Sequence, residues 1–186
     1  MKKIILAAIL GGLIVLIWGS ATWMALDVYV PHIKTLPNAN AVLGLLSKQK
    51  MEHAVYHFPG YFTGKTDKQL KVHEKRMLKG PNINFMVYSP KGYPPFSPKQ
   101  FIIGLLNSIV ACFIVALILS KTKSRFYISR VFLVTLFGVF AACLGPVANW
   151  NWWLFPMGFT VISALDLIFT WFLAGLIIAA LVRPQA

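Results

Sequence analysis

The stretch that decides the fold is Trp150-Asn151-Trp152-Trp153-Leu154-Phe155-Pro156, which is followed by an apolar run from Met157 to Val182. Apolar runs of about 20 residues can span a lipid bilayer, and Trp gathers where the hydrocarbon meets water. We therefore predict a membrane-spanning helix that begins below an interfacial collar of aromatic side chains, namely Trp150, Trp152, Trp153 and Phe155.

Three further apolar runs precede this one. The chain has 186 residues, of which 58% are hydrophobic, and this composition is too apolar for an ordinary soluble domain. The apolar residues gather in four runs, at 4–26, 101–119, 128–147 and 157–182. Each run can cross about 30 Å of hydrocarbon at about 1.5 Å per residue. We predict an all-α transmembrane four-helix bundle, in which the first run is an uncleaved anchor because it exceeds the 7 to 15 apolar residues typical of signal peptides.

Residues 27–99, between the first and second runs, predict a small α+β insertion. A helical pattern follows Asn38, and residues 54–58 and 83–88 have the composition or alternation of strands. Thr66 or Asp67 can cap a helix through Leu78, and Gly80-Pro81 would end it. Gly145-Pro146 similarly predicts the end of the third membrane helix, with a linker from Ala148 to Pro156.

Basic residues flank the four runs on one side. They are Lys2 and Lys3 before the first run, Lys121, Lys123, Arg125 and Arg130 between the second and third, and Arg183 after the fourth. The positive-inside rule then places both termini in the cytoplasm and residues 27–99 outside. The insertion itself has eleven basic and four acidic residues, which predicts attraction to anionic lipid headgroups or an acidic partner. No nucleic-acid motif accompanies this charge, so we expect no nucleic-acid partner.

Asp166 is the only carboxylate inside the four runs. An ionised carboxylate within a membrane helix costs about 2.5–3.5 kcal/mol on insertion scales, so such groups usually face the helix bundle and have a partner. Ser163 and Thr170 share its helix face, whereas Asn107 and Ser20 lie at a similar depth in other runs. We predict an intramembrane polar layer of Asp166, Asn107, Ser20, Ser163 and Thr170. It could fix helix register, handle protons or ions, or contact a partner, and the first use is favoured because no second acidic group marks a path.

Small residues four apart allow two membrane helices to approach closely, and such pairs occur in the first and third runs. They are Ala8 with Gly12, and Gly138 with Ala142.

His53 and His57 have a spacing that would suit zinc on a helix. On the strand predicted here they would lie about 13 Å apart, too far to share one ion. No Cys or second carboxylate completes a site, so we expect no metal and no cofactor. Hydrolase, P-loop, dinucleotide-binding and metalloprotease motifs are also missing from the sequence.

With these residues in view, the chain resembles a group of small, uncharacterised bacterial integral membrane proteins with four helices. The shared features are a Tyr-x-x-Pro-Gly-like turn, a Trp-Asn-Trp-aromatic-x-Phe-Pro collar and a final helix with Asp and Trp-x-Leu-Ala-Gly, here Tyr56 to Gly60, Trp150 to Pro156, Asp166 and Trp171 to Gly175. Leu154 stands where Gly is expected in that collar. The resemblance implies a bacterial inner (cell) membrane, hence a periplasmic insertion, and carries over no catalytic residue.

The leading hypothesis is a non-enzymatic inner-membrane protein that serves as an accessory or interaction subunit in contact with the lipid bilayer and a membrane protein partner. One alternative is a small transporter or proton-handling unit centred on Asp166. Another is a membrane enzyme or metal-dependent sensor that uses His53 and His57.

Overall fold

Four helices long and apolar enough to span a membrane dominate the computed structural model, which describes residues 1–60 and 66–183. They are α1 (Lys2–Met24), α4 (Pro98–Ser120), a continuous helical stretch from Tyr127 to Trp153, and α7 (Met157–Leu181). A two-stranded sheet lies between the first and second of them in the chain. The predicted four long apolar helices and the small α+β insertion between the first two are confirmed.

The third helix is longer than predicted. It consists of α5 (Tyr127–Ala142), a π-helical turn η2 (Cys143–Val147) and α6 (Ala148–Trp153). In an α-helix the ring of Pro146 would collide with the carbonyl group four residues earlier, but a π turn is wider and accommodates it. The prediction of a helix end at Gly145-Pro146 is therefore wrong, and the tryptophans of the collar form the last turn of the third helix.

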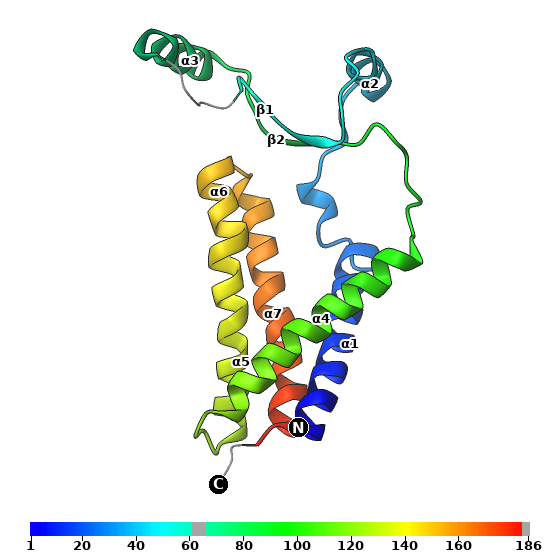
Figure 1. Cartoon of the computed structure of the whole chain (residues 1–186), viewed down its shortest axis with the longest axis vertical. Helices are drawn as coiled ribbons and strands as arrows, with labels where there is room; N and C mark the ends of the chain where they lie inside the picture. The colour runs from blue at the N-terminus through cyan, green and yellow to red at the C-terminus, as the bar shows by residue number, and fades with distance from the viewer. Residues whose placement is uncertain (61–65, 184–186) are drawn as a thin grey trace. The chain divides into compact units, whose positions relative to one another are not determined.

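The helices pack in the order α5, α7, α1, α4, with α7 in contact with both α5 and α1 (Figure 1). The buried core gathers where α1 begins and α7 ends. Its members are Ile4, Ala7, Ala8, Cys112, Val115, Ala116, Leu119, Val131, Val134, Ala174, Ile178, Ala179 and Val182. Grooves remain between the helices toward their other ends.

Both small-residue pairs lie at close helix contacts. A Cβ atom at Gly12 would lie 2.8 Å from the backbone nitrogen of Ile109 in α4. At Gly138 it would lie 2.8 Å from the Cα atom of Ile168 in α7. Glycine is needed at both positions because a methyl group has no room there.

The insert, residues Thr35–Pro94, is a second compact unit. It contains α2 (Ala39–Lys48), β1 (Ala54–Phe58), α3 (Asp67–Lys79) and β2 (Ile83–Tyr88). The strands are antiparallel, with Val55 opposite Val87, and lie where the sequence predicts them. In α3 the backbone N–H of Thr66 donates to Oε1 of Gln69 over 2.9 Å, which caps the helix start. Only His73 is buried among the insert residues that the structure describes.

Candidate functional site

Asp166 accepts one hydrogen bond on each of its carboxylate oxygens. The indole Nε1–H of Trp18 donates to Oδ1, and the hydroxyl of Tyr29 donates to Oδ2, each over 2.7 Å. Trp18 belongs to α1, and Tyr29 lies in the segment that follows it. Two donors aimed at two oxygens suit an ionised carboxylate, which accepts on both. These three residues, which we call the Asp166 clamp, tie α1 and the segment after it to α7.

Aromatic rings surround the two donors. Trp23 stacks on Tyr29 with ring centroids 4.0 Å apart and an interplanar angle of 11°. Phe159 lies 5.9 Å from Tyr29, and Phe169 lies 4.7 Å from Trp18. Aromatic pairs about 4.5–7 Å apart, such as the last two, add about 0.5–1.5 kcal/mol beyond area burial. The rings therefore hold both donors in the positions from which they reach Asp166.

The hydroxyl of Tyr29 is held in its protonated, donating form. Burial raises the pKa of Tyr29 well above its ordinary value, and the hydrogen bond to Asp166 and the carboxylate charge raise this pKa further. The hydroxyl of Ser163 opposes the shift and lowers the pKa slightly. Tyr29 consequently remains a donor to Asp166 across the physiological pH range.

The segment after α1 packs on the start of α7. Its short helix η1 (Val30–His32) brings the imidazole of His32 so near Gly158 that a Cβ atom there would lie 2.8 Å from Nδ1. Residues up to Lys34 accordingly belong to the helical unit, which comprises Met1–Lys34 and Pro95–Ala186. The compact insert is thus shorter than the predicted segment 27–99.

Three residues of the predicted polar layer divide between two grooves, and Ser163 and Thr170 line neither of them. Asp166 lines one of about 510 Å³ together with Trp18, Thr22 and Thr135. Ser20 and Asn107 line another of about 430 Å³ between α1 and α4. Thr170 is buried and Ser163 is half-buried on α7. The structure brings Asp166 together with two aromatic donors, and Ser20 together with Asn107.

The second of these grooves, which we call the α1/α4 groove, is lined by small and polar residues. They are Gly19, Ser20, Gly104, Asn107 and Ser108, together with apolar side chains and Gln100. The hydroxyl of Ser108 donates to the carbonyl of Gly104 over 2.9 Å. Asn107 is exposed, and no hydrogen bond of its amide occurs within the described part of the chain. The amide of Asn107 can therefore still donate and accept hydrogen bonds in this groove.

Arg130 lies inside α5, within the predicted third run, although it is counted above with the basic residues that flank the runs, and only 6% of its surface is exposed. Its Nε and Nη2 groups donate to the carbonyl of Ala179 over 3.2 and 3.0 Å, and Nη1 donates to the carbonyl of Arg125 over 2.7 Å. The last carbonyls of a helix lack partners within it and attract cations. Arg130 therefore caps the end of α7.

The remaining candidates are not members of the Asp166 clamp or the α1/α4 groove. His57 belongs to β1 and His53 directly precedes it. Within residues 1–60 and 66–183, no group of three or more His, Cys, Asp or Glu could hold a metal ion. In the collar, Trp150 and Trp152 are exposed, and the ring of Phe155 lies 5.8 Å from that of Phe159. Cys112 is buried, Cys143 is exposed, and both are free thiols.

No known protein family, curated protein or solved structure matches this chain. Its function is therefore inferred from the side-chain geometry described above.

Proposed function

We propose that this protein is a non-enzymatic subunit of the bacterial inner membrane whose α1/α4 groove receives a transmembrane helix of a partner protein. The observation that carries the proposal is the exposed amide of Asn107 in that groove. A polar side chain on a membrane helix is costly in hydrocarbon and is usually turned to another helix. An amide therefore favours a protein partner over lipid tails.

The shape of the groove suits a helix. Gly19 and Gly104 lie on opposite walls, and no atom lies within 4 Å of a Cβ atom built at Gly19. Small residues let the backbones of membrane helices approach, and polar side chains then bond across the contact at about 0.6–2 kcal/mol each. The groove volume of about 430 Å³ provides room for several side chains of a partner helix.

The Asp166 clamp stabilises the wall of this groove that α1 forms. Trp18 joins α1 to α7, while Ser20, two residues further along α1, lines the groove shared with α4. A fixed α1 keeps that wall in place. Because both oxygens of Asp166 already accept hydrogen bonds, this geometry favours a structural use of the carboxylate over the alternative of a proton or ion pathway.

The distribution of charge supports a topology. Both termini would lie in the cytoplasm, with Lys121, Lys123 and Arg125 on the same side, and the basic insert would lie in the periplasm. There its lysines would be attracted to anionic lipid headgroups.

The experiment is purification of the full chain from its own membranes in mild detergent, followed by native mass spectrometry. We expect a second polypeptide of defined mass that is lost with Asn107→Leu. The matched control is Leu106→Val, because Leu106 is 57% exposed on the same helix and lies outside the groove. A lone monomer, or a partner that survives Asn107→Leu, would contradict the proposal. A homodimer lost with Asn107→Leu would assign the groove to a second copy of this chain and would also contradict it.

A further inference from the structure

We propose that the insert has a binding pocket for a phosphate-bearing anion, formed by Lys68, His73 and Arg76 on one face of α3. The pocket gives a specific site to the proposed attraction between the insert and anionic headgroups, and in that respect it rests on the proposed function. It uses none of the residues of the Asp166 clamp or the α1/α4 groove.

A hollow of about 440 Å³ lies between α3 and the end of β1. Its lining residues are Pro59, Lys68, Gln69, Val72, His73 and Arg76. Positions 68, 69, 72, 73 and 76 recur at the spacing of a single helix face. Three basic residue types therefore meet around one hollow that has room for a phosphate group and more.

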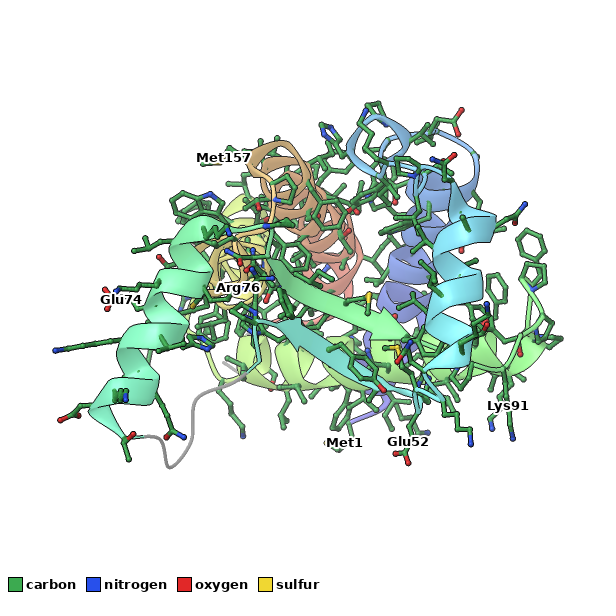
Figure 2. All side chains as sticks on the ribbon, turned by 90° about the horizontal axis from the view of Figure 1, so that it is seen from above. Met1, Glu52, Glu74, Arg76, Lys91 and Met157 are labelled. Atoms are coloured by element: carbon green, nitrogen blue, oxygen red, sulfur yellow. The ribbon has the colours of Figure 1, made fainter. Side chains whose placement is uncertain are left out.

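Arg76 is positioned for an anion. Its guanidinium carbon lies 5.1 Å from the centre of the Phe58 ring. A guanidinium group that rests on an aromatic face keeps its N–H groups at the edge, where they can bond two phosphate oxygens together. Figure 2 shows Arg76 on the side of α3 that faces the strands, whereas Glu74 points away from them.

The charge around the hollow is uncompensated. Asp67 and Glu74, the acidic residues of α3, do not line it. No carboxylate forms an ion pair with Lys68 or Arg76 within the described residues. Lys68 and Arg76 therefore leave positive charge beside the hollow, which attracts an anion.

Gln69 adds a further donor, and His73 forms part of the wall of the hollow. Oε1 of Gln69 accepts from the backbone N–H and the hydroxyl of Thr66, over 2.9 and 3.2 Å. The amide N–H groups are then the donating end of that side chain. His73 is only 7% exposed, so its ring has a fixed place in the wall of the hollow. The donors therefore belong to an ordered helix face.

The test uses the full chain in phosphatidylcholine nanodiscs. Isothermal titration calorimetry would measure binding of inorganic phosphate, of soluble dihexanoyl phosphatidylglycerol and of dihexanoyl phosphatidylcholine as the zwitterionic comparison. We expect binding of the phosphatidylglycerol that exceeds that of the phosphatidylcholine. Equal affinity for inorganic phosphate would identify the phosphate group itself as the ligand, whereas tighter phosphatidylglycerol binding would identify a lipid headgroup.

Substitutions inside and outside the hollow distinguish binding in the pocket from a general attraction of the insert to anions. Arg76→Gln and Lys68→Gln should each weaken binding about tenfold, the expected effect of losing a charge-assisted contact. Arg76→Lys should weaken it less, because it keeps the charge without the planar fork. Lys71→Gln removes the same charge from α3 outside the hollow and should leave affinity within about twofold.

Two results would overturn the pocket. One is equal weakening by Lys71→Gln and Arg76→Gln, which would leave only a diffuse attraction to anions. The other is no binding of either anionic probe, which would also remove the proposed headgroup attraction. The partner in the α1/α4 groove is tested separately, because Asn107→Leu should leave anion binding unchanged.

Discussion

Trp18 and Asp166, which are 148 residues apart in the sequence, are joined by a hydrogen bond of 2.7 Å from the indole Nε1–H to Oδ1. This bond connects α1 directly to α7. Tyr29 adds a second bond to the same carboxylate. The carboxylate of the last membrane helix thus stabilises the position of the first, and the α1/α4 groove depends on that position.

The clamp predicts thermodynamic coupling between its members. Trp18→Phe removes a donor to a carboxylate and should lower the free energy of unfolding by about 0.6–1.7 kcal/mol, the range of hydrogen bonds within membrane proteins. Asp166→Ala leaves two donors without their acceptor and should cost about 1–3 kcal/mol. Unfolding in mixed micelles, followed by circular dichroism, would provide both values.

A double-mutant cycle is the control for this prediction. In the Asp166→Ala background, Trp18→Phe should cost less than it does in the wild type, because its partner is already gone. Trp23→Phe retains a ring beside Tyr29 and should show weaker coupling to Asp166. An unchanged effect of Trp18→Phe in the two backgrounds would show that the bond contributes nothing to stability.

Gly12 and Gly19 lie on the same helix and should respond differently to alanine. A Cβ atom at Gly12 would meet the backbone of Ile109, whereas one at Gly19 would have nothing within 4 Å. Gly12→Ala should therefore destabilise the protein by about 1–3 kcal/mol through overpacking. Gly19→Ala should be neutral or should stabilise the helix by up to about 1 kcal/mol. Thermal unfolding in mild detergent would rank the two, and equal midpoints would refute the close contact between α1 and α4.

Arg130 and Arg125 form a pair of equal charge with different surroundings. Arg130→Gln removes two hydrogen bonds to the carbonyl of Ala179 and should lower stability by about 1.5–3 kcal/mol. Arg125 uses its backbone carbonyl in this network, so Arg125→Gln should change stability by less than about 0.5 kcal/mol. Both variants remove one positive charge, so a difference between them reports the loss of the helix cap and not the change in net charge. A similar loss in the two would assign the effect to net charge.

Leu154 lies in the left-handed region, with φ +55°, at the collar position where the resemblance has Gly. Left-handed backbone costs a non-glycine residue about 1–2 kcal/mol. Leu154→Gly should therefore be more stable than Leu154→Ala by about 1 kcal/mol. At Leu165, inside α7, the order should reverse by a similar amount because glycine weakens helices. Chemical unfolding of the four variants would measure both differences in the free energy of unfolding. A preference for alanine at both positions would contradict the left-handed backbone at Leu154.

The membrane helices can be predicted from the sequence because the thickness of a bilayer requires long apolar runs. The strands at 54–58 and 83–88 can also be predicted, because β-branched and aromatic residues and the alternation of apolar with polar residues reflect the local pleat of a strand. The predicted helix end at Pro146 is wrong because proline usually ends an α-helix, whereas here a wider π-helical turn accommodates it. Arg130 falls within the predicted third run, but its hydrogen bonds to the end of α7 depend on tertiary packing that the sequence does not reveal.

The partners of Asp166 were hidden for a different reason. Trp18 counts as apolar in any hydropathy reading, yet its indole has a donor that only tertiary packing brings to α7. Tyr29 fell in the segment assigned to the insertion, so its return to the helices could not be read from composition. The signal that would have identified these partners is a Trp or Tyr in another run at about the same depth in the membrane as a single carboxylate.

Site-specific photocrosslinking in native membranes tests the central claim most directly. A benzophenone side chain would replace Phe101, an aromatic residue that lines the α1/α4 groove and is 38% exposed, so that Asn107 stays in place. Leu106, outside the groove, would carry it in a parallel control sample. We expect a discrete protein adduct from position 101 that is weak or missing from position 106. Gly104→Leu, which fills the groove, should abolish it. Equal adducts from both positions, only lipid adducts at position 101, or an adduct that survives Gly104→Leu would contradict a partner helix in this groove.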